Sequence, residues 1–209
     1  MSASLSVAQI VPCTEAEGPG RRFALWFQGC PLRCPGCCNP EMLSFEGGQK
    51  RSVEGVAAEI QSTQRSHGIT GLTLLGGEPL AHAAGAAELS RAARNSGLSV
   101  MVFTGYTLEE ARSLADPAVA RLLELTDILV DGPFIRERPE RRRRWIGSEN
   151  QRIHFLTDRH NSDDSEWLQR NTVELRWDGA QLTVNGFPIR SEAMTGRWTR
   201  RRMPLKVTG

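Results

Sequence analysis

Residues 23–37 read FALWFQGCPLRCPGC and join an apolar run to a cysteine-rich loop. The run 23–27 is apolar at every position, which is typical of a strand buried on both faces, as in a parallel sheet. Gln28 and Gly29 end the run, and Cys30, Cys34 and Cys37 follow at once. The stretch therefore predicts an interior strand whose carboxyl end leads directly into a candidate metal site.

Three further apolar runs of this kind follow, at residues 72–75, 99–103 and 128–130, with helical patterns between them. The helix signals are an N-cap at Ser52, an alanine-rich stretch from about Ala83 to near Gly97, a capping box at Thr107 and Glu110, and Asp116-Pro117. Apolar strands that alternate with helices indicate parallel βαβ units, so the predicted fold class is α/β.

In such folds the chemistry lies at the carboxyl ends of the strands. The residues that follow the four predicted strands are Gln28-Gly29-Cys30, Gly76-Gly77-Glu78-Pro79, Thr104-Gly105-Tyr106 and Asp131-Gly132-Pro133. We expect them on one rim of the sheet, which is therefore the predicted site.

The pattern changes in the last third of the chain. Residues 153–156 are a candidate last strand of the main unit, and residues 173–177 and 181–185 form a candidate hairpin around Asp178-Gly179-Ala180. We therefore expect a main domain at 1–160, with its cysteine loop at 30–38, and a C-terminal appendage at 161–209. The appendage would comprise a β-hairpin at 173–185 and a basic tail at 191–209.

Composition narrows the class of protein. The 209 residues are 39% hydrophobic and 24% charged, as in an ordinary globular chain. A net charge of +2 is too small to indicate nucleic-acid binding. The longest apolar runs fall far short of the roughly 20 residues that cross a bilayer. The first nine residues lack the basic and apolar regions of a secretory signal, so we expect a cytoplasmic protein without a membrane partner.

Four of the five cysteines lie between Cys30 and Cys38, and Cys13 stands apart. An odd, tightly clustered set is a poor disulfide framework and favours a metal or cluster site. Cys30, Cys34 and Cys37 have C-x3-C-x2-C spacing, and three thiolates in one loop can hold three irons of a [4Fe–4S] cluster. The fourth iron then stays open to a small molecule with an amine and a carboxylate, such as S-adenosylmethionine.

Structural zinc is the alternative for this loop, with Cys38 or Cys13 as the fourth ligand. The four histidines are scattered and offer no second ligand pair. The GGEP segment at 76–79 also has two interpretations. Its glycines allow a ligand to approach the backbone and Glu78 could accept a ligand ammonium, or the segment is a strand-ending turn with an exposed Glu78.

Together these motifs resemble those of the radical S-adenosylmethionine superfamily, and more narrowly the activating proteins of anaerobic ribonucleoside-triphosphate reductase. The resemblance covers roughly residues 18–155. It rests on GGEP and on Gln28-Gly29-Cys30-Pro31, Cys34-Pro35-Gly36-Cys37, Asn39-Pro40-Glu41, Thr104-Gly105-Tyr106-Thr107, Asp131-Gly132-Pro133-Phe134 and Gly147-Ser148-Glu149-Asn150-Gln151-Arg152.

The resemblance implies a partial, open (β/α) barrel with mostly parallel strands. It implies cluster ligation by Cys30, Cys34 and Cys37, and the remaining cofactor-binding residues would be Gly36, Gly76, Gly77, Glu78, Pro79 and Thr104. Of these, residues 76–78 would receive the methionine amino group, and Thr104 would lie near the ribose or the methionine moiety. The reaction would abstract hydrogen from a glycine Cα of a partner glycyl-radical enzyme, with a one-electron donor such as flavodoxin or ferredoxin.

Several features depart from that family. Cys38 follows the third ligand directly and is predicted to be a small packed residue, and Cys13 to be structural or incidental. Arg141 to Arg144 form either a solvated loop or a docking surface for an acidic partner. The residues from Asn161 onward have no counterpart in the compact activating proteins.

Two other functions stay open. A radical enzyme acting on a peptide or a small heterocycle would share these motifs, although the deazaguanine-forming enzymes would have Cys-Asp-Thr where this chain has Cys37-Cys38-Asn39. An iron–sulfur electron-transfer or sensing module would want a fourth thiolate and would not need GGEP.

Overall fold

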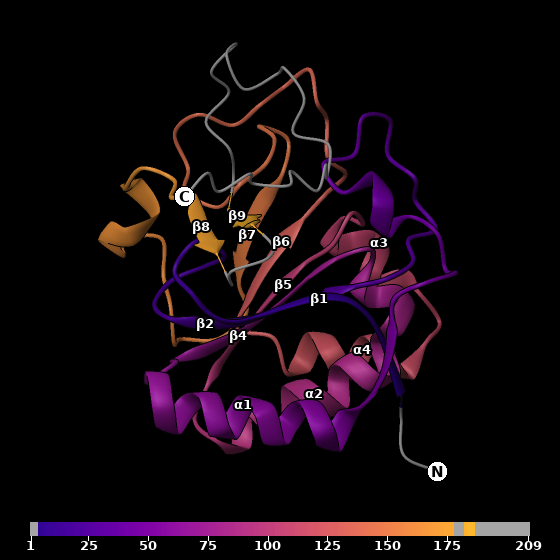
Figure 1. The fold of residues 1–209 in the computed structure, drawn as a ribbon. Helices are drawn as coiled ribbons and strands as arrows, with labels where there is room; N and C mark the ends of the chain where they lie inside the picture. The colour runs from indigo at the N-terminus through magenta and orange to yellow at the C-terminus, as the bar shows by residue number, and fades with distance from the viewer. Residues whose placement is uncertain (1–3, 178–181, 187–209) are drawn as a thin grey trace, which may run out of the picture.

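Seven strands form one mixed sheet in the computed structural model, which describes residues 4–177 and 182–186 (Figure 1). The strand order is β3-β1-β2-β4-β5-β6-β7. The strands are β1 (Ser4–Thr14), β2 (Arg22–Phe27), β3 (Gln49–Ser52), β4 (Gly71–Gly76), β5 (Ser99–Phe103), β6 (Ile128–Asp131) and β7 (Arg152–Phe155). The central strands β2, β4, β5 and β6 run parallel, whereas β1, β3 and β7 pair antiparallel.

The central strands are buried on both faces, as their uninterrupted apolar sequences predict. In β2, Phe23 and Leu25 belong to the large core on one face, and Ala24 and Trp26 belong to a smaller core on the other. Fully burying a side chain the size of leucine or phenylalanine stabilises the fold by roughly 1.5–3 kcal/mol. The predicted α/β class with a mostly parallel central sheet is confirmed.

Helices cover one face of the sheet. They are α1 (Val53–His67), α2 (Ala83–Asn95), α3 (Leu108–Ser113) and α4 (Pro117–Glu124), and α1, α2 and α4 lie side by side beneath the sheet in Figure 1. Ser52 caps α1 by accepting a hydrogen bond from the Gly55 N–H, and Thr107 and Glu110 form the predicted capping box. The helix starts predicted from capping residues are therefore confirmed.

Chain segments without long helices cover the opposite face. A second core there joins Met101, Ile128 and Val130 of the sheet to residues of later segments. Among these, the rings of Trp145 and Trp167 pack edge to face with centroids 5.0 Å apart. The loop 132–151 and the chain after β7 are thus part of the folded body.

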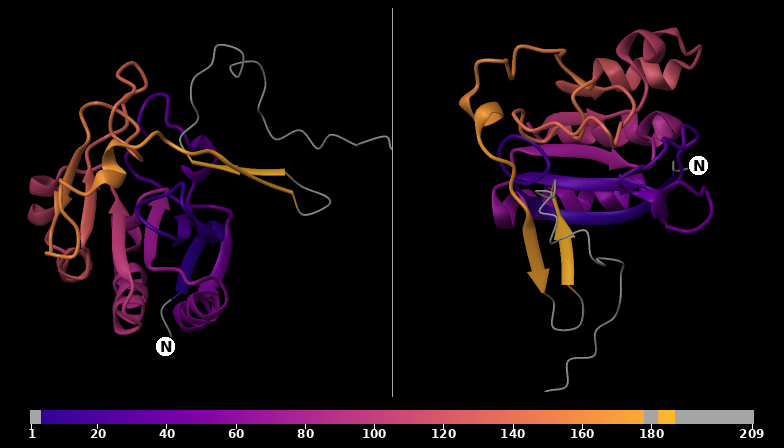
Figure 2. Two further views of the ribbon diagram at one scale, coloured as in Figure 1. Left: turned by 90° about the vertical axis from the view of Figure 1, so that its left-hand side faces the viewer. Right: turned by 90° about the horizontal axis from the view of Figure 1, so that it is seen from above.

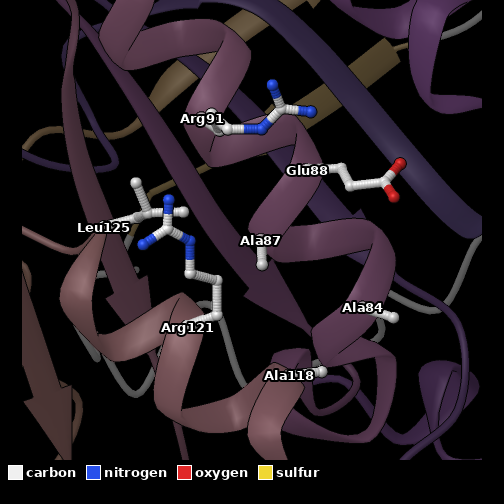
Figure 3. Close-up of a pocket in the computed structure, with 7 residues that line it drawn as sticks. All are labelled: Ala84, Ala87, Glu88, Arg91, Ala118, Arg121 and Leu125. Carbon is white, nitrogen blue, oxygen red and sulfur yellow. The ribbon is translucent and has the colours of Figure 1, made fainter.

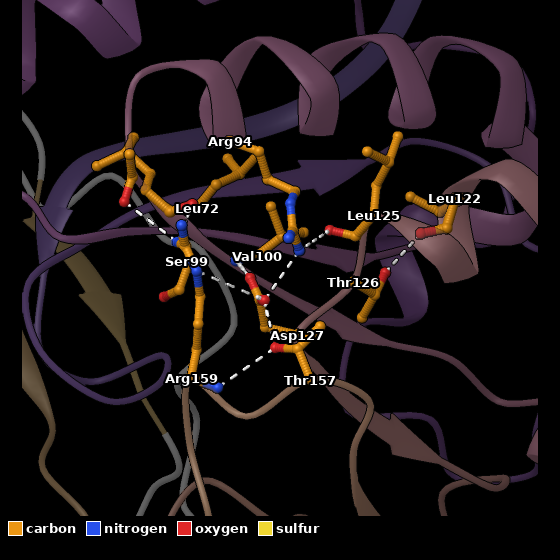
Figure 4. Close-up of polar contacts among 12 residues, drawn as sticks. Leu72, Arg94, Ser99, Val100, Leu122, Leu125, Thr126, Asp127, Thr157 and Arg159 are labelled. Atoms are coloured by element: carbon orange, nitrogen blue, oxygen red, sulfur yellow. Dashed lines mark hydrogen bonds and ion pairs between the residues drawn. The ribbon is translucent and has the colours of Figure 1, made fainter.

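Asp127, at the amino end of β6, ties several elements together (Figure 4). Its fully buried carboxylate accepts hydrogen bonds from the Val100 N–H at 2.8 Å and from Thr157 Oγ1 at 2.6 Å. It also pairs with Arg94 of α2 at 2.9 Å. This cluster lies at the opposite end of the strands from the cysteine loop, so it serves the fold.

The C-terminal strands β8 (Glu174–Trp177) and β9 (Leu182–Asn185) form a separate two-stranded antiparallel sheet that extends away from the body (Figure 2). It bonds to the end of β1 and to the segment that follows: the Asn185 amide donates to Thr14 Oγ1, and the Gly186 N–H donates to the Glu17 carboxylate. The two predicted hairpin strands are confirmed. The predicted turn at residues 178–180 and the predicted tail at 191–209 lie outside the described residues.

Two strands were not predicted. β1 carries Pro12 and two irregularities in its register with β2, so its sequence lacks a regular alternation. β3 has the polar sequence QKRS and lies at the edge of the sheet. Within the part of the chain that the structure describes, no helix is long and apolar enough to cross a membrane.

Candidate functional site

The carboxyl ends of the parallel strands bring the predicted site residues to one rim. Cys30 follows β2, Gly76 ends β4, Thr104 follows β5 and Asp131 ends β6. The pairing in register of β2 with β4 and of β5 with β6 sets this arrangement. The prediction that these residues gather on one rim is confirmed.

The cysteine loop leaves β2 and bends sharply. Cys30 is buried, and Cys34 and Cys37 are half-buried. The Cys37 N–H donates to the Cys34 carbonyl at 3.1 Å, which closes a tight turn. Arg33 and Gly36 have positive φ angles of 49° and 69°, so the loop curves back on itself and does not continue as a helix.

All three thiols are free, and their surroundings differ. Burial is the main cause that raises the pKa of Cys30, and the nearby Glu78 and Cys34 add to the rise. A hydrogen bond from the Cys38 thiol is the main cause that lowers the pKa of Cys37 to about 6. Cys37 also accepts the Asn39 N–H at 3.4 Å. Cys30 thus lies beside Cys34 and Glu78, at the inner side of the rim.

The other two cysteines lie in different surroundings. Cys38 is exposed, so the prediction that it is a packed residue is wrong. Cys13 lies one residue before Thr14, which pairs with Arg22 at the amino end of β2. Since a strand rises roughly 3.3 Å per residue, Cys13 is on the order of 20 Å from Cys30, which follows the carboxyl end of β2. Cys13 is therefore too distant to complete a zinc site with Cys30.

The GGEP segment packs directly on the backbone that leads into the cysteine loop. The Gly77 N–H donates to the Phe27 carbonyl at 2.8 Å, and the Glu78 N–H donates to the Gly29 carbonyl at 2.9 Å. A Cβ on Gly77 would lie 2.3 Å from the Gly29 oxygen, so only glycine fits. GGEP and the cysteine loop are therefore one structural unit.

Glu78 is 1% exposed, so the alternative of a turn with an exposed glutamate is wrong. Its carboxylate accepts hydrogen bonds from the Leu80 N–H at 2.9 Å, from Thr104 Oγ1 at 2.8 Å and from the Gly105 N–H at 2.9 Å. Burial raises the pKa of Glu78 to about 7. The side chain thus joins the ends of β4 and β5, and Pro79 begins the 3-10 helix Pro79–His82 beside it.

Three residues of the rim had no predicted role. The Gln28 side chain donates to the carbonyls of Glu41 and Ser44, at 3.1 and 2.7 Å, and so holds the chain beyond the cysteines. His82 stacks on Phe27 with ring centroids 5.0 Å apart. Tyr106 lies close enough to Glu78 and Cys30 for their charges to raise its pKa, although burial is the larger cause. Gln28 and Tyr106 belong to the motifs quoted above, and this was the only indication in the sequence that they have a role at the site.

Asp131-Gly132 and Gln151-Arg152, from two of the quoted motifs, bond to each other and form a clamp at the end of β6. Burial alone would raise the pKa of Asp131, but hydrogen bonds from Arg152 and the Leu108 N–H hold it below its usual range. Arg152 Nη2 lies 2.5 Å from Asp131 Oδ2. The side-chain amide of Gln151 donates to the Gly132 carbonyl at 3.1 Å. These contacts fix both ends of the loop 132–151.

The arginine run separates into two kinds of residue. Arg143 pairs with Glu140 at 2.5 Å and donates to the Gln151 carbonyl at 2.7 Å. Arg144 is buried, with its guanidinium 4.4 Å from the centre of the Trp145 ring. For these two the solvated-loop interpretation is wrong. Arg141 and Arg142 are exposed, and docking of an acidic partner on them stays a prediction.

The side chains on the cysteine loop are of the kind that ligates an iron–sulfur cluster. Three free thiols on one loop suit an iron–sulfur cluster, because thiolates are its normal ligands. Within residues 4–177 and 182–186, no three Cys, His, Asp or Glu side chains are already gathered in a metal-binding arrangement. The residues fit the cluster by type and by their place on one loop.

A groove of about 230 Å³ lies elsewhere, between α2 and α4 (Figure 3). Its lining residues are Ala84, Ala87, Glu88, Arg91, Ala118, Arg121 and Leu125. They belong to the helical face of the sheet and not to the rim that carries the cysteine loop. The groove is therefore not part of the candidate site.

Comparison with known proteins gives a consistent result. Residues 16–154 match the family described as 4Fe-4S single cluster domain. The chain is similar to the anaerobic ribonucleoside-triphosphate reductase-activating protein of Vibrio cholerae, with 34% identity over 156 residues, which cover 71% of this chain and 97% of that protein. The protein of the same name from Enterobacteria phage T4 is 32% identical over 155 residues, covering 72% and 94%.

Among solved structures, the chain is similar to QueE from Escherichia coli, with a TM-score of 0.40 and 19% identity. The similarity covers 50% of this chain and 54% of that one. A likeness this distant adds nothing to the sequence relationships.

Proposed function

The chain belongs to the family of anaerobic ribonucleoside-triphosphate reductase-activating proteins, and from this premise we propose that it generates a glycyl radical on an anaerobic ribonucleotide reductase. The reaction would use a [4Fe–4S] cluster and S-adenosylmethionine. The relatives align over nearly their whole length, so the proposal concerns the complete activating unit.

One observation supports this proposal above the others. Three free thiols lie on a loop whose entrance is bonded to the GGEP segment, through the Glu78 N–H and the Gly29 carbonyl. A structural metal knuckle has no need of that second segment. A site that holds both a cluster and a ligand on its open iron needs both segments at a fixed distance.

Cys30, Cys34 and Cys37 would hold the cluster. When bound, the reduced cluster supplies the electron that cleaves S-adenosylmethionine, and the resulting 5′-deoxyadenosyl radical removes a hydrogen atom from a glycine of the partner. Gly36 allows the loop to curve around the cluster, since its φ of 69° disfavours other residues. The thiols must be deprotonated to bind iron.

The GGEP segment and its neighbours would position S-adenosylmethionine. Gly76 and Gly77 leave their backbone groups open to close approach, and Glu78 supplies negative charge for the methionine ammonium. Thr104 and the Gly105 N–H hold the Glu78 carboxylate in place. Because burial raises the pKa of Glu78 to about 7, an arriving cation would favour its ionised form. Pro79 fixes the start of the following 3-10 helix.

We also propose the division of the chain. Residues 1–160 would form the catalytic unit, and residues 161–209 an appendage that the activation chemistry does not require. In support, the hydrogen bonds of the described residues 161–177 and 182–186 to the rest of the chain reach the end of β1, the segment that follows it and residues 144–145, and none reaches the cysteine loop. The reductant would be a small one-electron donor protein of the flavodoxin or ferredoxin class.

Electron paramagnetic resonance tests the proposal. The protein is reconstituted anaerobically with iron and sulfide, reduced, and mixed with S-adenosylmethionine and the anaerobic reductase of the same source organism. We expect a glycyl radical signal that requires both proteins. Cys34→Ala should abolish it, whereas Cys38→Ala, which removes the thiol of the loop that is not a proposed ligand, should preserve it.

If S-adenosylmethionine is cleaved but no glycyl radical forms on the reductase, the substrate is wrong. If Cys38→Ala abolishes cluster binding as Cys34→Ala does, the assignment of three ligands is wrong.

A further inference from the structure

The cysteine loop is covered on one side by an arginine from a distant segment. A Cβ built on Gly36 would lie 2.9 Å from Nε, 3.2 Å from Cβ and 3.2 Å from Cδ of Arg136. The stem of Arg136 therefore lies along the backbone between Cys34 and Cys37. Glycine at position 36 provides the room for it, in addition to allowing the positive φ.

The position of Arg136 is fixed by its flanking residues. The N–H of Ile135 donates to Ser148 Oγ at 3.2 Å, and the Ile135 carbonyl accepts the Arg138 N–H at 3.1 Å. The Arg138 carbonyl in turn accepts the Glu149 N–H at 2.8 Å. Together with the clamp at Asp131 and Gln151, these bonds hold residue 136 against the cysteine loop.

The charge of Arg136 has no counter-charge at this place. Among the residues that the structure describes, no carboxylate pairs with its guanidinium, whereas Arg138 and Arg143 of the same run have glutamate partners. Cys34 and Cys37, which flank Gly36 on this loop, would be negatively charged thiolates when they hold iron. Arg136 thus places a positive charge beside the loop. Its guanidinium stays protonated at all relevant pH values.

We propose that Arg136 is a positioning residue that closes the cysteine loop over its cluster and raises the reduction potential of that cluster. The inference rests on the proposed function, because it assumes a [4Fe–4S] cluster on Cys30, Cys34 and Cys37. Reduction adds one electron from the donor to the cluster, with no bond or proton transferred, and makes the site more negative by one charge. A positive charge nearby stabilises that reduced state, because the net charge around an iron–sulfur cluster is one of the factors that set its reduction potential.

The contact predicts the size of the effect only in order of magnitude. Removing a unit charge from the edge of such a site should change the reduction equilibrium by about tenfold. For a one-electron couple this corresponds to about 59 mV, toward more negative potential. The activation reaction would then need a stronger reductant.

The test measures the midpoint potential of the reconstituted full chain by a redox titration followed by electron paramagnetic resonance, without S-adenosylmethionine and without a reductase. Three variants are compared with the wild type. Arg136→Gln removes the charge, and Arg136→Lys keeps it. Arg142→Gln is the matched control, because Arg142 belongs to the same loop and is exposed like Arg136, but is not in contact with Gly36.

We expect the potential of Arg136→Gln to fall by about 59 mV, while Arg136→Lys and Arg142→Gln stay near the wild type. An unchanged potential in Arg136→Gln, or an equal fall in Arg142→Gln, overturns the inference. If Arg136→Gln cannot hold iron, the lysine variant decides: iron retained at the wild-type potential supports the role of the charge, and iron lost refutes it. If the wild type assembles no cluster, the proposed function is refuted as well. If the wild type and Arg136→Gln both assemble a cluster and have equal midpoint potentials, only the role of Arg136 is refuted.

Discussion

Replacing Glu17 by glutamine should remove one pH dependence of folding stability. Glu17 lies between β1 and β2 and is 4% exposed. Its carboxylate accepts the Gly186 N–H of the C-terminal appendage at 2.7 Å. Burial raises its pKa from 4.5 to about 7, although the hydrogen bonds from Gly186 and Asn185 oppose the rise.

The sign and the size follow from that rise. Between pH 4.5 and 7 the folded chain keeps a proton on Glu17 that the unfolded chain has lost. The stability contributed by this proton is therefore fully present below pH 4.5, and it is lost as the pH rises through 7. Each pKa unit corresponds to about 1.4 kcal/mol, so the rise from 4.5 to about 7 corresponds to a loss of up to about 3 kcal/mol.

Urea denaturation of the reduced, metal-free full chain between pH 5 and pH 8.5 measures the effect. The quantity compared is the free energy of unfolding of Glu17→Gln minus that of the wild type, because other titrating groups cancel in the difference. It should rise with pH by up to about 3 kcal/mol. Glu46→Gln, at an exposed position, should give a flat difference. A difference for Glu17→Gln that does not change with pH would refute the reasoning.

Three further substitutions test other contacts. Gly77→Ala places a Cβ 2.3 Å from a backbone oxygen and should lower both iron content and stability, the latter by about 1–3 kcal/mol. Gly47→Ala meets open space, so its positive φ is its only cost: it should lose about 1–2 kcal/mol and keep its iron. Asp127→Ala leaves Arg94 and a buried N–H without their partner, so thermal unfolding should show a loss of about 3–5 kcal/mol. Thr107→Ala removes the capping box and should cost about 1 kcal/mol in urea denaturation without changing iron content.

The sequence predicted the central sheet because its strands are apolar at nearly every position. Runs such as 23–27 and 99–103 have no polar face, and helices with recognisable caps separate them. β1 and β3 were not predicted, each for a different reason. β1 is irregular around Pro12, and β3 is a polar edge strand that the sheet stabilises mainly through backbone hydrogen bonds.

The place of the site was predictable, but its internal contacts were not. Parallel topology alone brings Cys30, Glu78 and Thr104 to one rim. That Glu78 is buried and bonded to the end of β5 depends on side-chain packing, which no local pattern encodes. The contact of Arg136 with Gly36 joins positions 100 residues apart, and the run of arginines around Arg136 suggested only a charged surface.

Cleavage of S-adenosylmethionine tests the central claim most directly. The reconstituted protein is reduced with dithionite under anaerobic conditions, and 5′-deoxyadenosine is quantified for the wild type, Cys34→Ala and Cys38→Ala. If Cys30, Cys34 and Cys37 hold a cluster that cleaves S-adenosylmethionine, the wild type and Cys38→Ala form 5′-deoxyadenosine and Cys34→Ala does not. A wild type that binds only zinc, or that assembles the cluster and forms no 5′-deoxyadenosine even with its reductase present, would contradict the claim.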